Sequence, residues 1–337
     1  MFLKNVLLSA LLAKGLLLAS PLQAQESALS YDQYLSELKQ QAVEQGIAQG
    51  TIDAVFDQIK LFKKAVVNEP AKSGPENLDK YLPNRVSEAL VEQARSLYRD
   101  NKALFDRLGK EYGVQPRFVL AYWGITSAFD ASDYPALTVI ASNAYHGEQA
   151  VNVAQAYGGD GYDAAFISAL KLMERDQLKF DNLKSDSTGL MGYPHFTPKQ
   201  LAKYGQDGNG DGRVDIWHSL DDAFATTANY LKQLGWDYDG TWGRQVSAPK
   251  ALPQDLVGLA VHKGFDQWQA LGVRRFNGSD LPSRKDMQVS LIMPDGKNGR
   301  SYLVYDNYRV LRKTQGSEHL TLAVTYLSER IKYPEIK

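Results

Sequence analysis

Helical periodicity is the feature that most constrains this fold, because apolar residues recur at three- and four-residue steps in six segments of the first 235 residues. The segments that carry this pattern are 31–60, 87–110, 118–129, 139–145, 164–180 and 220–234. Residues 236–312 differ, since they are rich in Gly, Pro and aromatic side chains. They contain two strand-like runs, Gln288–Met293 and Ser301–Tyr305, and the turn-forming pairs between these runs are typical of an antiparallel hairpin. The chain therefore predicts a mostly helical α+β fold.

The same patterns divide the chain into segments of different character. They are an N-terminal helical region over 25–110, a helical core over 111–235, a β-rich subdomain over 236–312 and a C-terminal helix within 313–337 that packs back on the helical body. Within the first segment, Thr51 is expected to cap a second short helix. Residues 63–83 contain three prolines and are expected to cross the surface.

The first 24 residues have the features of a secretory signal peptide. Lys4 supplies the positive start, an apolar stretch follows, and Ala24 ends a cleavage sequence. Lys14 interrupts the apolar stretch well short of the length that spans a bilayer, which argues against an uncleaved anchor. We therefore expect an exported protein, soluble in the periplasm, with no membrane span after signal removal.

Composition excludes several classes of protein. The 38 Lys and Arg against 39 Asp and Glu give a net charge of −1, so nothing indicates a nucleic-acid partner. The chain has no Cys, which excludes disulfides, thiolate catalysis, thiolate metal sites and an acylated N-terminal Cys anchor.

An Asp- and Gly-rich run from residue 207 to residue 215 is the most specific local chemical signal. Oxygen ligands at alternating positions can surround a hard cation, and Gly212 supplies the sharp turn at the sixth position of such a loop. The twelfth position is His218 instead of a bidentate Glu, so Asp222 or water would have to complete the shell. The expected ligands of a structural Ca²⁺ in this EF-hand-like loop are Asp207, Asn209, Asp211, Arg213 through its carbonyl, Asp215 and Asp222. A turn-rich loop without an ion is the alternative.

Several motifs occur in an order that resembles family B of the lytic murein transglycosylases across essentially the whole mature chain. The matching pieces are Tyr112-Gly113-Val114-Gln115-Pro116, Tyr122-Trp123-Gly124-Ile125, Gly189-Leu190-Met191-Gly192, Phe196-Thr197-Pro198, the 207–217 loop, Ala228-Asn229-Tyr230-Leu231, Leu271-Gly272-Val273-Arg274-Arg275 and Asn307-Tyr308-Arg309-Val310. The resemblance implies a lysozyme-like helical core with a cleft for the glycan strands of peptidoglycan. It also implies one catalytic Glu, which protonates the glycosidic oxygen while the 6-hydroxyl of the sugar attacks and leaves a 1,6-anhydro end.

The chain departs from this family at the acid itself. The family's W-G-x-E-T pattern reads Trp123-Gly124-Ile125-Thr126-Ser127 here, which puts Thr126 at the position of the Glu. A hydroxyl cannot deliver a proton to a leaving alkoxide at a useful rate. Asp130 could substitute if the helix continued one more turn, and Asp186 is a second candidate acid.

Other positions in the expected cleft have also changed type. The Arg pair of the family is Glu148-Gln149 here, the Gln before Phe-x-Pro is His195, and the C-terminal Asn aligns with Gln315. Tyr193, between Gly192 and Pro194, is the aromatic residue best placed to contact a sugar. Together Tyr193, His195, Glu148, Gln149 and Gln315 are the expected substrate-binding residues.

These patterns predict a catalytically impaired member of the family that engages peptidoglycan glycan strands, and possible partners include other cell-wall enzymes. Two alternatives stay open at this point. One is an active transglycosylase with a relocated acid, and the other is a non-enzymatic scaffold for protein interactions.

Overall fold

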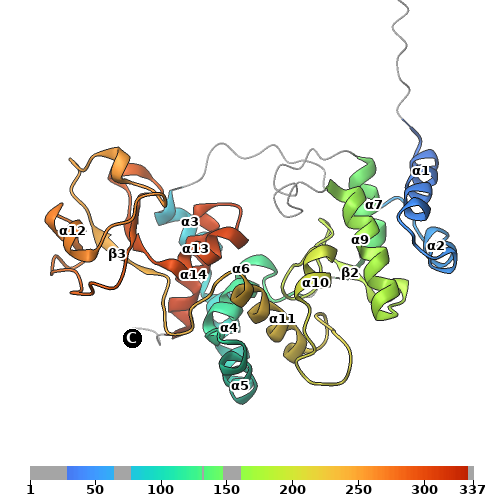
Figure 1. Ribbon diagram of the computed structural model, residues 1–337, viewed down its shortest axis with the longest axis horizontal. Coiled ribbons are helices and arrows are strands. Elements are labelled where there is room, and N and C mark those ends of the chain that lie inside the picture. The colour runs from blue at the N-terminus through green and yellow to red at the C-terminus, as the bar shows by residue number, and fades with distance from the viewer. Residues whose placement is uncertain (1–28, 64–76, 131–132, 147–160, 333–337) are drawn as a thin grey trace, which may run out of the picture.

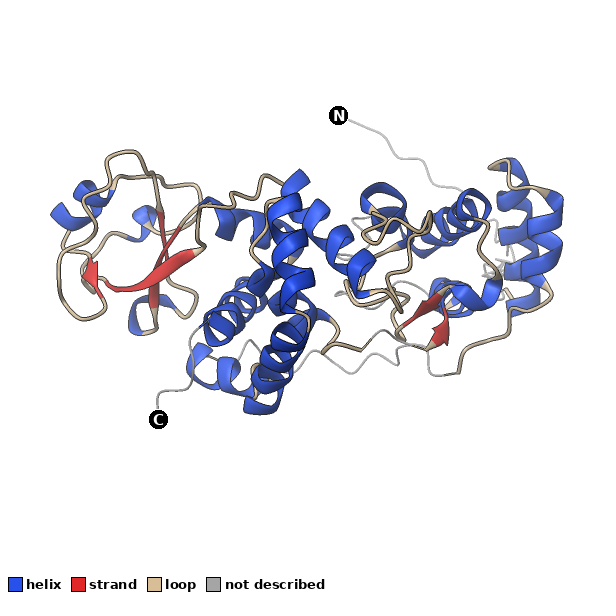
Figure 2. Ribbon diagram, turned by 90° about the horizontal axis from the view of Figure 1, so that it is seen from below, coloured by secondary structure: helices blue, strands red, loops and turns tan. Residues whose placement is uncertain are grey.

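The computed structural model describes residues 29–63, 77–130, 133–146 and 161–332. The expected signal peptide and the pair Glu148-Gln149 lie outside the described residues. The molecule is elongated, with α1, α2, α7 and α9 toward one end and the strand β3 toward the other (Figure 1). Figure 2 shows that the two small sheets lie on opposite sides of the central helices.

The helical elements follow the periodic segments closely. Their bounds are α1 Tyr31–Glu44, α2 Gln49–Phe56, α3 Leu78–Arg85, α4 Glu88–Asp100, α5 Lys102–Tyr112, α6 Pro116–Thr126, α7 Ala136–Tyr145, α9 Gly161–Asp176, α10 Pro198–Tyr204, α11 Leu220–Gln233, α12 Phe265–Ala270, α13 Asp306–Thr314 and α14 Glu318–Lys332. The strands are β1 Tyr134–Pro135, β2 Lys184–Ser185, β3 Gly243–Ser247, β4 Arg274–Arg275, β5 Ser290–Ile292 and β6 Ser301–Val304. The mostly helical α+β fold is therefore confirmed.

Helix α6 lies at the centre of the body because nearly all of its side chains are apolar. Residues 118–125 are all buried, and the helix packs against α14, α4, α5 and α11. Pro116 starts it at a position where the missing backbone N–H has no helical partner. It ends at Thr126 because Ala128 and Phe129 take left-handed backbone angles, with φ of 51° and 61°. The helix expected over 118–129 thus ends three residues early.

Two other expectations about elements are wrong. Residues 87–110 do not form one helix, because Asn101, at φ −119° and ψ 25°, separates α4 from α5. Thr51 is not an N-cap, since α2 begins at Gln49 and Ala48 occupies its N-cap position. Most of the segment 63–83 lies outside the described residues, and its described end carries the start of α3, from Leu78 on.

The β-rich part contains an antiparallel sheet in the order β4–β3–β6–β5. The expected hairpin is confirmed, with Leu291 of β5 opposite Leu303 of β6. Strand β6 is buried on both faces: Tyr302 and Val304 join the core of the helical body, whereas Leu303 joins a second apolar cluster around Trp268. The sheet thus joins the two cores directly.

No helix among the described residues is both long enough and apolar enough to cross a membrane.

Candidate functional site

A cavity of about 630 Å³ opens where the end of α6 meets the turn between α13 and α14. Helix α6 contributes Tyr122, Ile125 and Thr126 to its wall. The remaining described lining residues are Arg85 at the end of α3, Leu190 and His195 from the loop after β2, Gln200 of α10, Tyr230 of α11, residues 312–317 and Leu320. The cavity therefore collects segments that are far apart in the sequence, and it includes the position of the expected catalytic acid.

Thr126 lies in the cavity wall, but its hydroxyl already has a partner. The Oγ1 atom donates a hydrogen bond to the carbonyl oxygen of Tyr122 at 2.8 Å, one turn back along α6. Arg85 donates from Nη2 to the carbonyl oxygen of Ile125 at 2.5 Å and so caps the same helix end. None of the described residues that line the cavity is an Asp or a Glu. The wall offers hydroxyl, amide, imidazole and cationic groups in place of a carboxylic acid.

The Asp186 side chain forms hydrogen bonds within the loop that contains His195. Its Oδ1 accepts hydrogen bonds from the backbone N–H of Thr188 at 2.8 Å, the hydroxyl of Thr188 at 2.6 Å and the backbone N–H of Leu190 at 3.0 Å. It is not among the lining residues of the cavity. These bonds hold its carboxylate to its own turn.

Asp130 does not lie on a continuation of α6, because the helix ends at Thr126. Its backbone N–H donates to the carbonyl oxygen of Ser127 at 2.9 Å, its side chain is exposed, and it does not line the cavity. The geometric premise for Asp130 as a substitute acid, one turn further along the same helix face, is therefore wrong.

Among the cavity-wall side chains whose pKa is shifted by burial, His195 is the one whose ordinary pKa lies near neutral pH. Burial lowers the pKa of His195, the carboxylates of Asp186 and Asp130 oppose this shift, and the positive charge of Arg85 adds to it. The distance from Nδ1 to Oδ2 of Asp186 is 3.8 Å. A lowered pKa keeps the imidazole mainly neutral at pH 7, so it can accept or donate a hydrogen bond without carrying charge.

The other expected substrate-binding residues divide into three groups. Gln315 is buried and lines the cavity, and its Nε2 donates to the hydroxyl of Thr314 at 3.2 Å. Tyr193 does not line the cavity, because its ring stacks on Trp123 with centroids 5.3 Å apart and planes at 28°. Glu148 and Gln149 lie outside the described residues.

The wall also contains three basic residues that no sequence motif indicates: Arg85, Arg312 and Lys313. They come from the ends of α3 and α13, and nothing in their local sequence marks them. Lys313 belongs to the expected C-terminal segment. Its place at the cavity depends on how α13 packs against α14, which the local sequence does not show.

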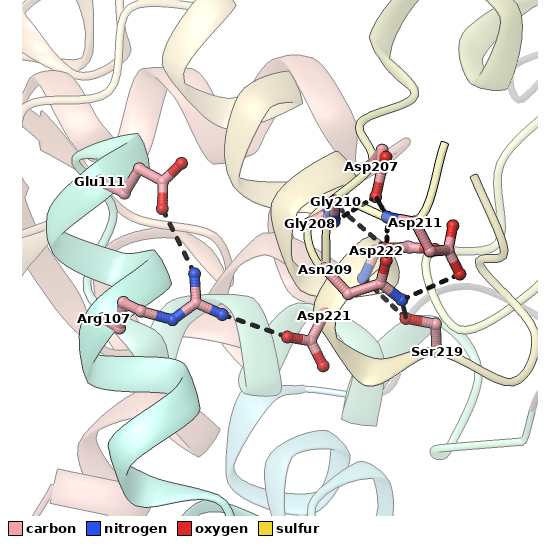
Figure 3. Close-up of polar contacts among 10 residues, drawn as sticks. All are labelled: Arg107, Glu111, Asp207, Gly208, Asn209, Gly210, Asp211, Ser219, Asp221 and Asp222. Carbon is pink, nitrogen blue, oxygen red and sulfur yellow. Dashed lines mark hydrogen bonds and ion pairs between the residues drawn. The ribbon is translucent and has the colours of Figure 1, made fainter. Parts of the chain in front are cut away.

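The Asp- and Gly-rich loop is held together by bonds from backbone amides to carboxylates. Asp207 accepts from the N–H of Gly212 at 2.7 Å and from that of Gly210 at 2.6 Å (Figure 3). These bonds hold the pKa of Asp207 below the ordinary value. Asp222 is fully buried and accepts at 2.8 Å from both Gly208 and Asp215. Burial raises the pKa of Asp222 in spite of these bonds.

Two further contacts fix the position of this loop. Figure 3 shows the guanidinium of Arg107 between Glu111 of its own helix and Asp221 of α11, with 3.1 Å from Nη2 to Oδ1 of Asp221. Asp215 accepts from the backbone N–H of His218 at 2.9 Å and also contacts its ring. His218, at the twelfth loop position, therefore faces Asp215.

The donor types of this loop suit a hard cation, but their arrangement does not form a ready cage. Within the part of the chain that the structure describes, no group of three or more Asp, Glu or His is arranged to hold a metal ion. Both oxygens of Asp222 are directed at backbone amides. The expected EF-hand-like arrangement is thus not seen in the side-chain positions.

This chain has a helical body, small sheets and a cavity at the end of a buried central helix. It therefore has the lysozyme-like fold of lytic transglycosylases. The family model described as "Transglycosylase SLT domain" matches residues 30–329. The chain therefore belongs to this family and, within it, to the family B lytic transglycosylases.

Solved structures and a curated relative agree with this assignment. SltB3 from Pseudomonas aeruginosa, solved in complex with NAG-anhNAM-pentapeptide, is 29% identical, with a TM-score of 0.81 over 90% of this chain and 80% of that chain. The Escherichia coli lytic transglycosylase Slt35, solved in complex with calcium, shares the fold, with a TM-score of 0.71 at 20% identity over 89% and 92% of the two chains. Membrane-bound lytic murein transglycosylase B of Escherichia coli is 28% identical over 180 residues, which are 52% of this chain and 47% of the relative. The match thus spans about half the length of that curated relative.

Proposed function

We propose that this protein engages the glycan strands of peptidoglycan through the cavity at the end of α6 and is strongly impaired in cleaving them. One observation carries the proposal: none of the described lining residues is an Asp or a Glu. The sequence motif that aligns Thr126 with the family's acid position supports it. SltB3, which shares the fold and 29% of its residues with this chain, has been solved with NAG-anhNAM-pentapeptide and with NAG-NAM-pentapeptide. That likeness supports a glycan ligand.

The impairment follows from the chemistry that the cavity lacks. Cleavage of a glycosidic bond needs a proton on the leaving oxygen, and a positioned carboxylic acid contributes about 10²- to 10⁴-fold to the rate. The hydroxyl of Thr126 is far too weak an acid for this role, and its proton is already donated to the carbonyl oxygen of Tyr122. The neutral imidazole of His195 is a poor acid near pH 7, because its lowered pKa leaves little of the protonated form.

An assay on purified peptidoglycan tests both halves of the proposal. We expect the protein to co-sediment with sacculi and to release no muropeptides with 1,6-anhydro ends above the blank. Protein that stays in the supernatant would favour the scaffold alternative instead. Release of anhydro ends would favour the active alternative, and loss of that release in Asp130→Asn or Asp186→Asn would identify the acid.

We also propose that the 207–222 loop binds calcium as a structural ion. The support is the alternation of oxygen donors, together with the calcium complex of Slt35, which shares the fold. In this proposal Asp207, Asn209, Asp211, Asp215 and Asp222 would supply side-chain oxygens and Arg213 its carbonyl, after the carboxylates turn from the backbone amides toward the ion. Calcium would fix the loop and take no part in the reaction.

Thermal unfolding tests the calcium proposal. We expect millimolar CaCl₂ to raise the Tm of the wild type relative to EDTA, since a ligand that binds only the folded state stabilises it. Asp211→Asn should lose most of this increase, and MgCl₂ at equal concentration should give little. An equal Tm in CaCl₂ and EDTA would overturn the proposal.

We propose, finally, that the protein acts in the periplasm after removal of residues 1–24, where other cell-wall enzymes are possible partners. The support is the basic start, the apolar stretch and the cleavage sequence of the first 24 residues. N-terminal sequencing of the protein recovered from a periplasmic extract is expected to begin at Gln25. Recovery of the intact N-terminus in the membrane fraction would contradict this.

A further inference from the structure

Positive charge is concentrated on the β-rich part of the molecule, away from the cavity at the end of α6. Residues 236–312 contain eleven Lys and Arg against eight Asp and no Glu, whereas the whole chain has a net charge of −1. This part forms one end of the elongated molecule, with α12 at its outer side (Figure 1). A protruding end with a net positive charge can attract and reach a negatively charged partner.

Three arginines of this end gather around the hydroxyl group of Tyr305. Arg244 of β3 donates from Nε to this hydroxyl at 2.6 Å. Arg275 of β4 lies opposite Val246, which is two residues along β3 from Arg244, so both arginines lie on the same face of the sheet. Burial raises the pKa of the hydroxyl, and the positive charges of Arg244, Arg275 and Arg284 oppose this shift. All three guanidiniums therefore lie near one buried side chain.

Two of these guanidiniums have no carboxylate partner. Arg284 pairs with Asp286 at 2.6 Å. Arg244 and Arg275, in contrast, form no ion pair with any other described residue. The Tyr305 hydroxyl accepts a hydrogen bond from Arg244 but does not neutralise its charge. Like charges that are held close together repel each other, and an anion bound beside them would relieve this repulsion.

The turn after β4 exposes a large apolar side chain directly beside these arginines. Phe276 follows Arg275 and is 71% exposed. Two backbone hydrogen bonds close this turn, from Gly278 to the carbonyl oxygen of Arg275 at 2.8 Å and from Arg275 to that of Ser279 at 2.9 Å. Leu271, before β4, is also 37% exposed. A phenyl ring left in water adds nothing to folding stability, so the turn offers apolar surface to a partner.

We propose that this end of the protein docks on the surface of a bilayer that contains anionic phospholipids, with Arg244 and Arg275 at the lipid phosphates and Phe276 at the boundary of the acyl chains. The inference goes beyond the proposed function and does not depend on the cavity. A guanidinium fork pairs with a phosphate through two parallel hydrogen bonds. Interfacial binding combines such attraction with the burial of an apolar side chain. Because the ring lies on an exposed turn and not in a groove, a fluid bilayer fits it better than a folded acidic protein.

Co-sedimentation with lipid vesicles tests this docking. The processed protein that begins at Gln25 is used, because the apolar stretch before it would itself enter lipid. Vesicles of phosphatidylcholine are compared with vesicles of phosphatidylcholine and phosphatidylglycerol. We expect binding to the anionic vesicles alone, and loss of most of it at high salt. Glycerol 1-phosphate offers the same phosphate chemistry without a bilayer, and its binding is measured separately by calorimetry.

Single substitutions locate the docking surface. Arg275→Gln should lower the partition coefficient on anionic vesicles about fivefold. Phe276→Ser should lower it about tenfold, because its ring no longer enters the interface. In the helical body, Arg99→Gln removes an exposed positive charge from α4 and Val43→Ser removes a 53% exposed apolar side chain from α1. These two control variants should bind as the wild type does, and circular dichroism confirms that all four are folded.

Three results would overturn the inference. Equal binding to neutral and anionic vesicles would remove the role of the arginines. Binding that is unchanged in both Arg275→Gln and Phe276→Ser would place the contact on another face of the molecule. Absence of binding to either kind of vesicle would exclude the bilayer as the partner, and binding of glycerol 1-phosphate in that case would assign the cluster to a soluble phosphate.

Discussion

At the scale of single residues, the polar groups at the end of α6 around Thr126 have hydrogen-bond partners without any acidic side chain. Its hydroxyl is bonded to Tyr122, and the carbonyl oxygen of Ile125 is bonded to Arg85. Arg85 lines the same cavity as Thr126, and a nearby guanidinium lowers the pKa of a carboxyl group. We therefore expect that a Glu placed at residue 126 would not by itself reach the raised pKa that the family chemistry needs.

His195 provides a direct probe of the electrostatics of the cavity. We expect its pKa, measured by NMR from the ring Cε1–H, to lie below the ordinary histidine value, because burial disfavours the charged imidazolium. Asp186→Asn should lower this pKa further, since the Asp186 carboxylate stabilises the positive charge. A His195 pKa at or above the ordinary value, or a rise in the variant, would contradict the charge balance described for the wall.

The residues of the site show what a sequence motif can and cannot reveal. The motif around Thr126 predicts a replaced acid because a fixed pattern surrounds that position. No such pattern marks Arg85, because its contact is with the carbonyl oxygen of Ile125, forty residues away. The Gly and Pro that flank Tyr193 predict a ligand contact, but they do not reveal that its ring stacks on Trp123.

At the scale of elements, the packing of α6 against α14 positions the two helices that contribute Thr126 and Leu320 to the cavity wall. Gly124 lies on α6 at this contact, and a Cβ atom at this position would lie 2.6 Å from Cδ2 of Leu327. Leu327 is fully buried, so it has little room to move away. The glycine allows the two helices to approach closely.

Substitution of this glycine is expected to destabilise the body. Gly124→Ala should lower the free energy of unfolding by about 1–3 kcal/mol, the usual cost of overpacking a buried helix contact. Urea denaturation followed by circular dichroism measures the change. Gly50→Ala in α2 is the matched control: nothing lies within 4 Å of the added Cβ, so better helix propensity should stabilise by up to about 1 kcal/mol. Equal effects of the two substitutions would contradict the packing argument.

The sequence predicts helices and strands well where a regular apolar pattern extends over many residues. It predicts their ends less well. The hairpin of β5 and β6 follows from alternation and from turn residues. The early end of α6 does not, because the left-handed angles of Ala128 and Phe129 are imposed by the fold and not by these residue types. Strand β3 was missed because Gly243–Ser247 pairs with β6, which is distant in sequence.

At the scale of the whole molecule, Asp295 connects the β-rich part to the helical body. It follows β5, and its Oδ2 accepts from the backbone N–H of Leu78 at 2.9 Å while Oδ1 contacts Nε2 of His319 at 3.2 Å. Both His319 and the Asp295 side chain are largely buried. One carboxylate thus joins the start of α3, the start of α14 and the hairpin.

Removal of this carboxylate should loosen that junction. We expect Asp295→Ala to lower the free energy of unfolding by about 1–3 kcal/mol, because it leaves the buried N–H of Leu78 and the ring of His319 without their partner. The control is Asp280→Ala, whose carboxylate is mostly exposed and pairs loosely with Arg274 at 3.5 Å. If Asp295→Ala lowers the free energy of unfolding no more than the control does, the Asp295 carboxylate does not stabilise this junction and the prediction is wrong.

The central claim is that the cavity binds glycan strands without a general acid to cleave them. Its most direct test is the rate at which 1,6-anhydro muropeptides appear when the wild-type protein is incubated with purified peptidoglycan, measured by mass spectrometry against a family member that has Glu at this position. We expect a rate at least about 10²-fold below that member, the share that a positioned acid contributes. A comparable rate from the wild-type protein would contradict the claim.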